Sequence, residues 1–163
     1  MRFPEFGVNC TPNYPRNRRS KNDQGLRENE PLFDMRSYLE QDVANALTEH
    51  KVLWKYESFY MRDSSDVHLT RQKRWTPDFE LPNHVLLEVK PHRGKPFHWS
   101  ASLAFQVAFI TAVAAHYYDV FLGNTKNGFF KVVPQEQATL DRDYLENALR
   151  PSSFAQVIAA AVR

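Results

Sequence analysis

Charged side chains interrupt an otherwise apolar stretch within residues 74–91. We predict two short strands here, joined by a turn at residues 81–83, because proline and asparagine favour turns. Side chains alternate across a strand, so Glu88 and Lys90 share one face of the second strand. If the strands pair through the turn, Asp78 of the first strand comes near Glu88. The spacing therefore brings two carboxylates and an ammonium group together.

Charged groups in an apolar strand are costly unless they are paired or bound to a metal. Two neighbouring carboxylates repel each other unless a divalent cation lies between them, and oxygen ligands suit Mg²⁺ or Mn²⁺. In the alternative interpretation, Asp78 is an ordinary turn residue and Glu88 and Lys90 form an ion pair on an edge strand. The joint spacing between predicted strands favours the metal site.

Pro77-Asp78 followed by Glu88-x-Lys90 resembles the signature of the PD-(D/E)XK nuclease superfamily. The resemblance implies that Asp78, Glu88 and the backbone carbonyl of Val89 bind the metal. It also implies that Lys90 positions the attacking water and offsets charge on the phosphate. These roles suit phosphodiester hydrolysis, because a bound metal lowers the pKa of its water and positive charge stabilises the transition state.

A helix is predicted from a cap at Asp34 or Ser37 to about His50. Its apolar stripe consists of Leu39, Val43, Ala46 and Leu47. Glu40 borders this stripe and, taken alone, would be read as a solvated boundary residue. In many nucleases of the superfamily a glutamate of the first helix joins the metal centre, so the resemblance makes Glu40 the candidate for a catalytic and metal-binding role.

The remaining elements complete an α/β (α+β) pattern with the order α-β-β-β-α-β-β-α-α. We predict a strand over residues 52–61, a helix over 97–116, strands over 119–123 and 129–133, a helix over 136–149 and a last helix from Ser152 or Ser153 to Val162. This order matches a restriction-endonuclease-like core, in which helices flank a central mixed β-sheet.

Basic residues are grouped along the chain, although the net charge is only +2 and the pI is near 8.7. Residues 1–30 are expected to form a basic, poorly structured arm, and residues 31–163 a single nuclease domain. The basic residues expected to contact DNA are Arg16, Arg18, Arg19 and Lys21 of the arm, Arg71, Lys73 and Arg74 before the motif, and His92, Arg93 and Lys95 after it. A solvated tail and solvated loops are the alternatives. Whether Gln106, His92 or His98 assists the chemistry is left open.

A cytoplasmic protein is expected, in a bacterial or phage-infected cell. The single cysteine, Cys10, cannot form an internal disulfide, and no Cys/His spacing indicates zinc. The first residues lack the pattern of a signal peptide. The most apolar stretch, residues 101–115, is too short to span a bilayer, so no membrane partner is expected.

Residues 34–90 resemble one family of this superfamily more specifically, the endonuclease I of short-tailed bacteriophages. The most specific part of this resemblance is the Thr-Pro-Asp-Phe-x-Leu-Pro-Asn block, residues 76–83. That family resolves Holliday junctions and debranches DNA. It implies a magnesium-dependent homodimer that exchanges a strand between subunits and cuts opposing strands. Pro91 is a departure, because the family often has glycine there.

The Glu-Val-Lys-Pro segment is also similar to TnsA-like transposase endonucleases, which would imply a recombination or transposition partner protein. The other alternative is a non-catalytic DNA-binding or assembly protein that keeps the nuclease fold.

Overall fold

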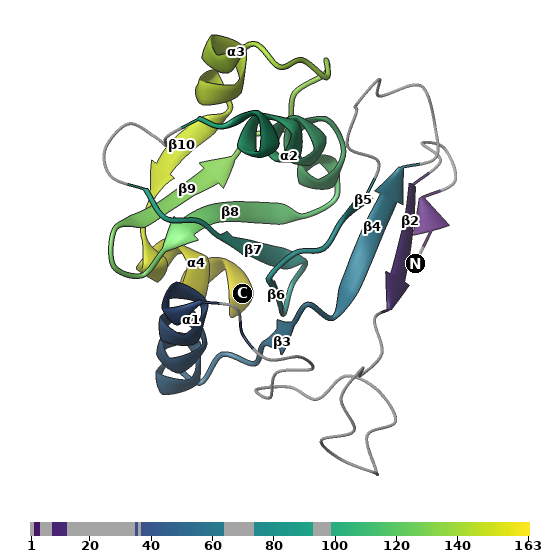
Figure 1. The fold of residues 1–163 in the computed structure, drawn as a ribbon. Helices are drawn as coiled ribbons and strands as arrows, with labels where there is room; N and C mark the ends of the chain where they lie inside the picture. The colour runs from purple at the N-terminus through teal and green to yellow at the C-terminus, as the bar shows by residue number, and fades with distance from the viewer. Residues whose placement is uncertain (1, 4–7, 13–34, 36, 64–73, 93–98) are drawn as a thin grey trace.

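The computed structural model describes residues 2–3, 8–12, 35, 37–63, 74–92 and 99–163 (Figure 1). Its centre is a six-stranded sheet with the strand order β10-β9-β8-β7-β6-β3. The bounds are β3 (Lys55–Tyr56), β6 (Phe79–Leu81), β7 (Val85–Val89), β8 (Asp119–Asn124), β9 (Gly128–Val132) and β10 (Leu149–Ser152). β7 and β8 are parallel, whereas the other neighbours are antiparallel. The predicted fold class, a mixed sheet flanked by helices, is confirmed.

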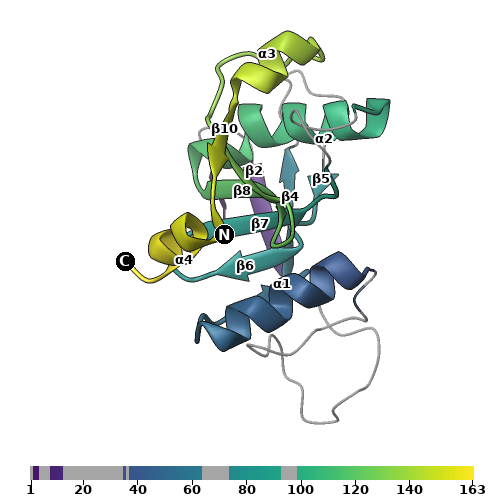
Figure 2. The same ribbon diagram turned by 90° about the vertical axis from the view of Figure 1, so that its left-hand side faces the viewer.

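Helices cover both faces of this sheet (Figure 2). α1 (Tyr38–Glu49) and α4 (Phe154–Ala161) lie on one face, and α2 (Ala101–Ala112) lies on the other with the short helices η2 (Ala114–His116) and α3 (Arg142–Asn147). None of the helices in the described ranges is long and apolar enough to cross a membrane. Because helices cover both of its faces, the sheet is buried on both sides, which explains the nearly continuous apolar sequence of β7 and β8.

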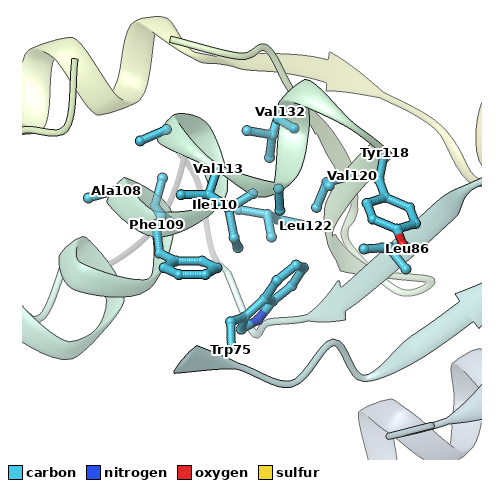
Figure 3. Close-up of a cluster of buried hydrophobic side chains, with 14 of the residues drawn as sticks. Trp75, Leu86, Ala108, Phe109, Ile110, Val113, Tyr118, Val120, Leu122 and Val132 are labelled. Atoms are coloured by element: carbon cyan, nitrogen blue, oxygen red, sulfur yellow. The ribbon is translucent and has the colours of Figure 1, made fainter. Parts of the chain in front are cut away.

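Alternation along β7 assigns its side chains to the two layers. Val85, Leu87 and Val89 pack with α1 and α4. Leu86 points the other way and joins the cluster formed by α2 and Trp75, shown in Figure 3. Glu88 shares that second face, as its bonds to Trp75 and to a residue of α2 show. The face assignments predicted for this strand are therefore confirmed.

Serine caps define where three helices begin. The Ser37 hydroxyl accepts the Glu40 N–H at 3.2 Å, so the first helix is capped by Ser37 and not by Asp34. Ser100 caps α2 in the same way, and Ser153 forms a capping box with Gln156 in α4. The buried face of α1 differs from the predicted stripe, because Glu40 and Ala44 are buried with Val43 and Leu47, whereas Leu39 and Ala46 are only half-buried.

A second, four-stranded sheet was not predicted. Its strand order is β1-β2-β4-β5, with the bounds β1 (Arg2–Phe3), β2 (Val8–Pro12), β4 (Phe59–Asp63) and β5 (Arg74–Trp75). The prediction of a poorly structured arm is therefore wrong for residues 2–3 and 8–12, because β2 pairs with β4 and β1 pairs with β2. The rest of the arm lies outside the described residues.

The strand predicted over residues 52–61 is divided between the two sheets. It breaks between β3 and β4 at Glu57, whose φ of 47° is left-handed. The Glu57 N–H donates to the Asp78 carbonyl at 2.9 Å, because the facing chain also passes from β5 to β6 at this point. Asp78 therefore lies where the paired chains cross from one sheet to the other.

The helix predicted over residues 136–149 is also wrong in extent. Only Arg142–Asn147 is helical, capped by Asp141, whose side chain accepts from the N–H groups of Asp143 and Tyr144. Leu149–Ser152 instead forms β10, which pairs antiparallel with β9 at the edge of the sheet. An edge position tolerates Pro151, because a proline has no N–H to donate.

Candidate metal centre

The β6–β7 hairpin brings Asp78, Glu88 and Lys90 together. Phe79 pairs with Leu87, and the register continued by one residue places Asp78 opposite Glu88. Both carboxylates are buried, with 8% and 4% of their surface exposed. The Lys90 Nζ lies 3.1 Å from Glu88 Oε2, and Asp78 Oδ2 accepts the Val89 N–H at 2.7 Å. These are the neighbours expected from the spacing of the motif.

Glu88 is held by three side chains from different parts of the chain. Its Oε1 accepts the indole N–H of Trp75 from β5 at 3.2 Å. Its Oε2 accepts from the Gln106 amide of α2 at 3.0 Å and from Lys90. Sequence reasoning missed Trp75 altogether and left Gln106 open. The sequence offers only a weak indication of the Trp75 contact: a buried indole N–H usually finds an acceptor, but the sequence does not show which one.

The environment opposes negative charge at both acids. Burial raises the pKa of Asp78 well above its usual value, and the negative charges of Glu88 and Glu40 raise it further. The Val89 N–H and Lys90 act in the opposite direction, but more weakly. Burial also raises the pKa of Glu88, against the attraction of Lys90 and the hydrogen bonds that Glu88 accepts. A bound cation would relieve this repulsion.

Glu40 lies in the first turn of α1 and is 6% exposed. The Ser37 hydroxyl donates to its Oε2 at 3.2 Å. The negative charge of Glu40 raises the pKa of Asp78. Across the described part of the chain, however, no three His, Cys, Asp or Glu side chains are arranged to hold a metal ion. The structure thus places Glu40 near Asp78 without forming the three-carboxylate cluster implied for it.

Two carboxylates nevertheless fit a hard divalent cation, because Mg²⁺ is commonly bound through one or two of them and keeps water or phosphate oxygens elsewhere. Asp78 Oδ1 has no hydrogen bond to the described residues, and Glu88 Oε1 accepts only one. A carboxylate oxygen has two lone pairs, so both atoms retain acceptor capacity. Asp78 and Glu88 therefore keep oxygen atoms suited to Mg²⁺ or Mn²⁺, and the resemblance adds the carbonyl of Val89 as a further ligand.

Two of the residues predicted to contact DNA are described, and both are engaged within the fold. Arg74 is exposed on β5, with its guanidinium 3.8 Å from the centre of the Tyr60 ring. The His92 ring donates from Nε2 to the Gly128 carbonyl at 3.0 Å and meets the ring of Phe130 edge-on. The other predicted contacts and His98 lie outside the described residues, namely Arg16, Arg18, Arg19, Lys21, Arg71, Lys73, Arg93 and Lys95.

The arrangement places two buried carboxylates beside an ammonium group, a chemistry that suits a divalent cation and an anionic substrate. No protein-family model, no curated protein and no solved structure matches this chain. The function must therefore be argued from the residues at the adjoining ends of β6 and β7.

Proposed function

We propose that this protein is a metal-dependent DNA endonuclease of the PD-(D/E)XK type, which hydrolyses phosphodiester bonds. The observation that carries the proposal is the meeting of Asp78, Glu88 and Lys90, with both carboxylates buried and facing each other across paired strands. Two buried carboxylates that face each other are costly unless a bound cation neutralises their charges. A bound Mg²⁺ or Mn²⁺ would supply Lewis acidity and a water of lowered pKa.

Each residue of the site has a distinct role in this proposal. Asp78 and Glu88 hold the cation with the Val89 carbonyl, and Glu40 adds a third negative charge beside Asp78. Lys90 keeps its ammonium at the site through its ion pair with Glu88 and offers positive charge where the phosphate gains negative charge. The hydrogen bonds from Trp75 and Gln106 to Glu88 set the direction in which that carboxylate points.

A nicking assay on supercoiled plasmid tests the proposal. The wild-type protein should cut with Mg²⁺ or Mn²⁺ and stop when EDTA is added. Asp78→Asn and Lys90→Ala should each lower the rate by at least about 10²-fold, whereas Glu136→Gln, which changes an exposed acid in a loop, should not. Equal rates in all these proteins, or DNA binding without cleavage in any divalent metal, would refute catalysis at this site.

We further propose that the substrate is branched DNA and that the enzyme is a homodimer. The support is the likeness of residues 34–90 to the phage endonuclease I family, whose task needs two cuts and so two sites. A four-way junction should be cut faster than a linear duplex of the same sequence, and light scattering should give twice the mass of one chain. Equal cleavage rates on the two substrates would contradict the branch specificity and indicate a nuclease without preference for DNA structure.

Two other functions have some support. A non-catalytic DNA-binding protein is favoured by the polar network at Glu88, since Lys90, Trp75 and Gln106 stabilise this carboxylate without a metal. Such a protein would bind DNA but would not cleave it in the presence of any divalent metal. A TnsA-like transposase subunit is favoured by the Glu-Val-Lys-Pro segment, and it would cut one DNA end only when its partner protein is added.

A further inference from the structure

The backbone of Lys90 lies against the end of β8. Its N–H donates to the carbonyl of Gly123 at 2.9 Å. Its own carbonyl accepts from Nδ2 of Asn124, also at 2.9 Å. Two consecutive residues of β8 therefore hold both polar groups of the Lys90 backbone, just beyond the point where β7 ends at Val89.

Asn124 links this contact to the turn between β8 and β9. Its side chain is fully buried, with 0% exposed. While Nδ2 reaches Lys90, Oδ1 accepts the N–H groups of Lys126 and Asn127 at 3.0 and 2.8 Å. A single buried amide thus closes the turn and fastens it to the chain that leaves the candidate metal centre.

Other contacts of the turn hold the same segment. Gly123 has a φ of 142°, and a Cβ built there would lie 2.2 Å from the Gly128 carbonyl oxygen, so only glycine permits this approach. The Gly128 carbonyl in turn accepts from His92, two residues after Lys90. Pro91 between them has no N–H to contribute. The turn therefore supplies the anchoring that a continued strand ladder would otherwise give.

We propose that Asn124 is a positioning residue that acts through Lys90. Lysine carries its charge on a flexible four-carbon stem that cannot fix the ammonium by itself, so a loosely held backbone would add further freedom to the position of the charge. The ammonium lies 3.1 Å from Glu88, and in the proposed nuclease it must keep that place while a phosphate is bound. A displacement of about 1 Å in such a group can cost on the order of 10²-fold in rate. The catalytic consequence rests on the proposed nuclease function, whereas the anchoring of Lys90 does not.

Three variants separate the bond to Lys90 from the closing of the turn. Asn124→Ala removes both. Asn124→Ser keeps a neutral acceptor that can close the turn, but the serine side chain ends one bond short of Nδ2 and loses the contact with Lys90. Asn127→Ala is the matched control, because this exposed residue contributes only its backbone N–H to Asn124.

Steady-state cleavage is the first measurement, made well below the melting temperature of each variant. Both Asn124 variants should lose at least about 10-fold in kcat, with KM and metal-free DNA affinity close to those of the wild type. Asn127→Ala should match the wild type in all three. If Asn124→Ser keeps the wild-type kcat, Asn124 only closes the turn and the proposal is wrong.

Amide hydrogen exchange measured by NMR tests the anchoring without any nuclease activity. In Asn124→Ser the Lys90 N–H should exchange about 10-fold faster or more, while the Leu87 N–H in the middle of β7 should keep its protection. Unchanged protection at Lys90 would overturn the proposal. Faster exchange at Lys90 in a protein whose wild type cuts no DNA would instead refute the proposed function and leave the anchoring in place.

Discussion

Asp78 is expected to destabilise the metal-free protein, so Asp78→Asn should stabilise it. The carboxylate is buried and faces Glu88, and its charge is opposed further by Glu40. Asparagine has nearly the same shape and keeps an oxygen that can accept the Val89 N–H. The substitution thus removes the charge while leaving the local hydrogen bond possible.

The size of the effect follows from the geometry of the hairpin. Side chains directly opposite each other on antiparallel strands lie about 5 Å apart. At an effective dielectric constant of about 20, two unit charges at that distance repel by about 3 kcal/mol. Lys90 and the Val89 N–H offset part of this repulsion. We therefore expect Asp78→Asn to raise the free energy of unfolding by about 1–3 kcal/mol, or the Tm by about 3–10 °C for a chain of this size.

The gain should depend on pH in one direction. The pKa of Asp78 is raised in the folded protein, so the folded state holds its proton more tightly than the unfolded chain. That contribution to stability is fully present below the unfolded pKa of about 4 and is lost as the pH rises through the folded pKa. The advantage of Asp78→Asn should accordingly be small near pH 4 and grow toward alkaline pH.

Thermal unfolding in EDTA from pH 4 to pH 9 measures this advantage, with Glu136→Gln as the control for loss of an exposed acid. Addition of Mg²⁺ at alkaline pH should stabilise the wild type more than Asp78→Asn and so reduce the difference between them. A variant that is less stable than the wild type at alkaline pH, or a difference that does not vary with pH, would show that Asp78 is already balanced by charges within the protein.

Two other substitutions test how the site is built. Trp75→Phe keeps an aromatic ring in the core and removes the N–H that Glu88 Oε1 accepts; Mg²⁺ or Mn²⁺ affinity, measured by titration calorimetry, should fall about 10–100-fold, and an unchanged affinity would deny Trp75 any part in orienting Glu88. Gly123→Ala should cost at least about 2 kcal/mol in urea unfolding, because its Cβ would strike the Gly128 carbonyl. Gly128 also has a positive φ, so Gly128→Ala strains the backbone too, but it should cost less because its Cβ would come no closer than 3.9 Å to the Ser152 carbonyl oxygen; equal losses would contradict the steric argument.

Patterns of short range were predictable from the sequence. The alternation of residues 84–90 and the turn before them place Asp78 and Glu88 opposite each other, because the register of a hairpin follows from its turn. Asn83 and His84 accept the left-handed φ values of 63° and 58° that this turn requires. Local spacing also offered two candidate caps for the first helix and two for the last, of which Ser37 and Ser153 are used, and the order of elements indicated the mixed sheet with helices on both faces.

Strand pairing between distant segments was not predictable. The sequence of residues 52–61 reads as one strand, and only the crossing against Asp78 divides it between two sheets. Residues 8–12 have little strand character of their own and become a strand by pairing with β4. The segment ending at Leu149 has helical spacing, yet Leu149 itself begins β10, which completes the sheet along β9. In each case tertiary pairing outweighs local preference.

The amino-acid sequence by itself therefore determined which acids and which lysine meet, because they lie on one hairpin whose period is two residues. Only the tertiary structure decided what surrounds them. Trp75 comes from the second sheet, Gln106 from the helix above the first, and Asn124 from the neighbouring parallel strand. Their contacts depend on how whole layers pack, and no periodicity within a segment encodes the distance to another layer.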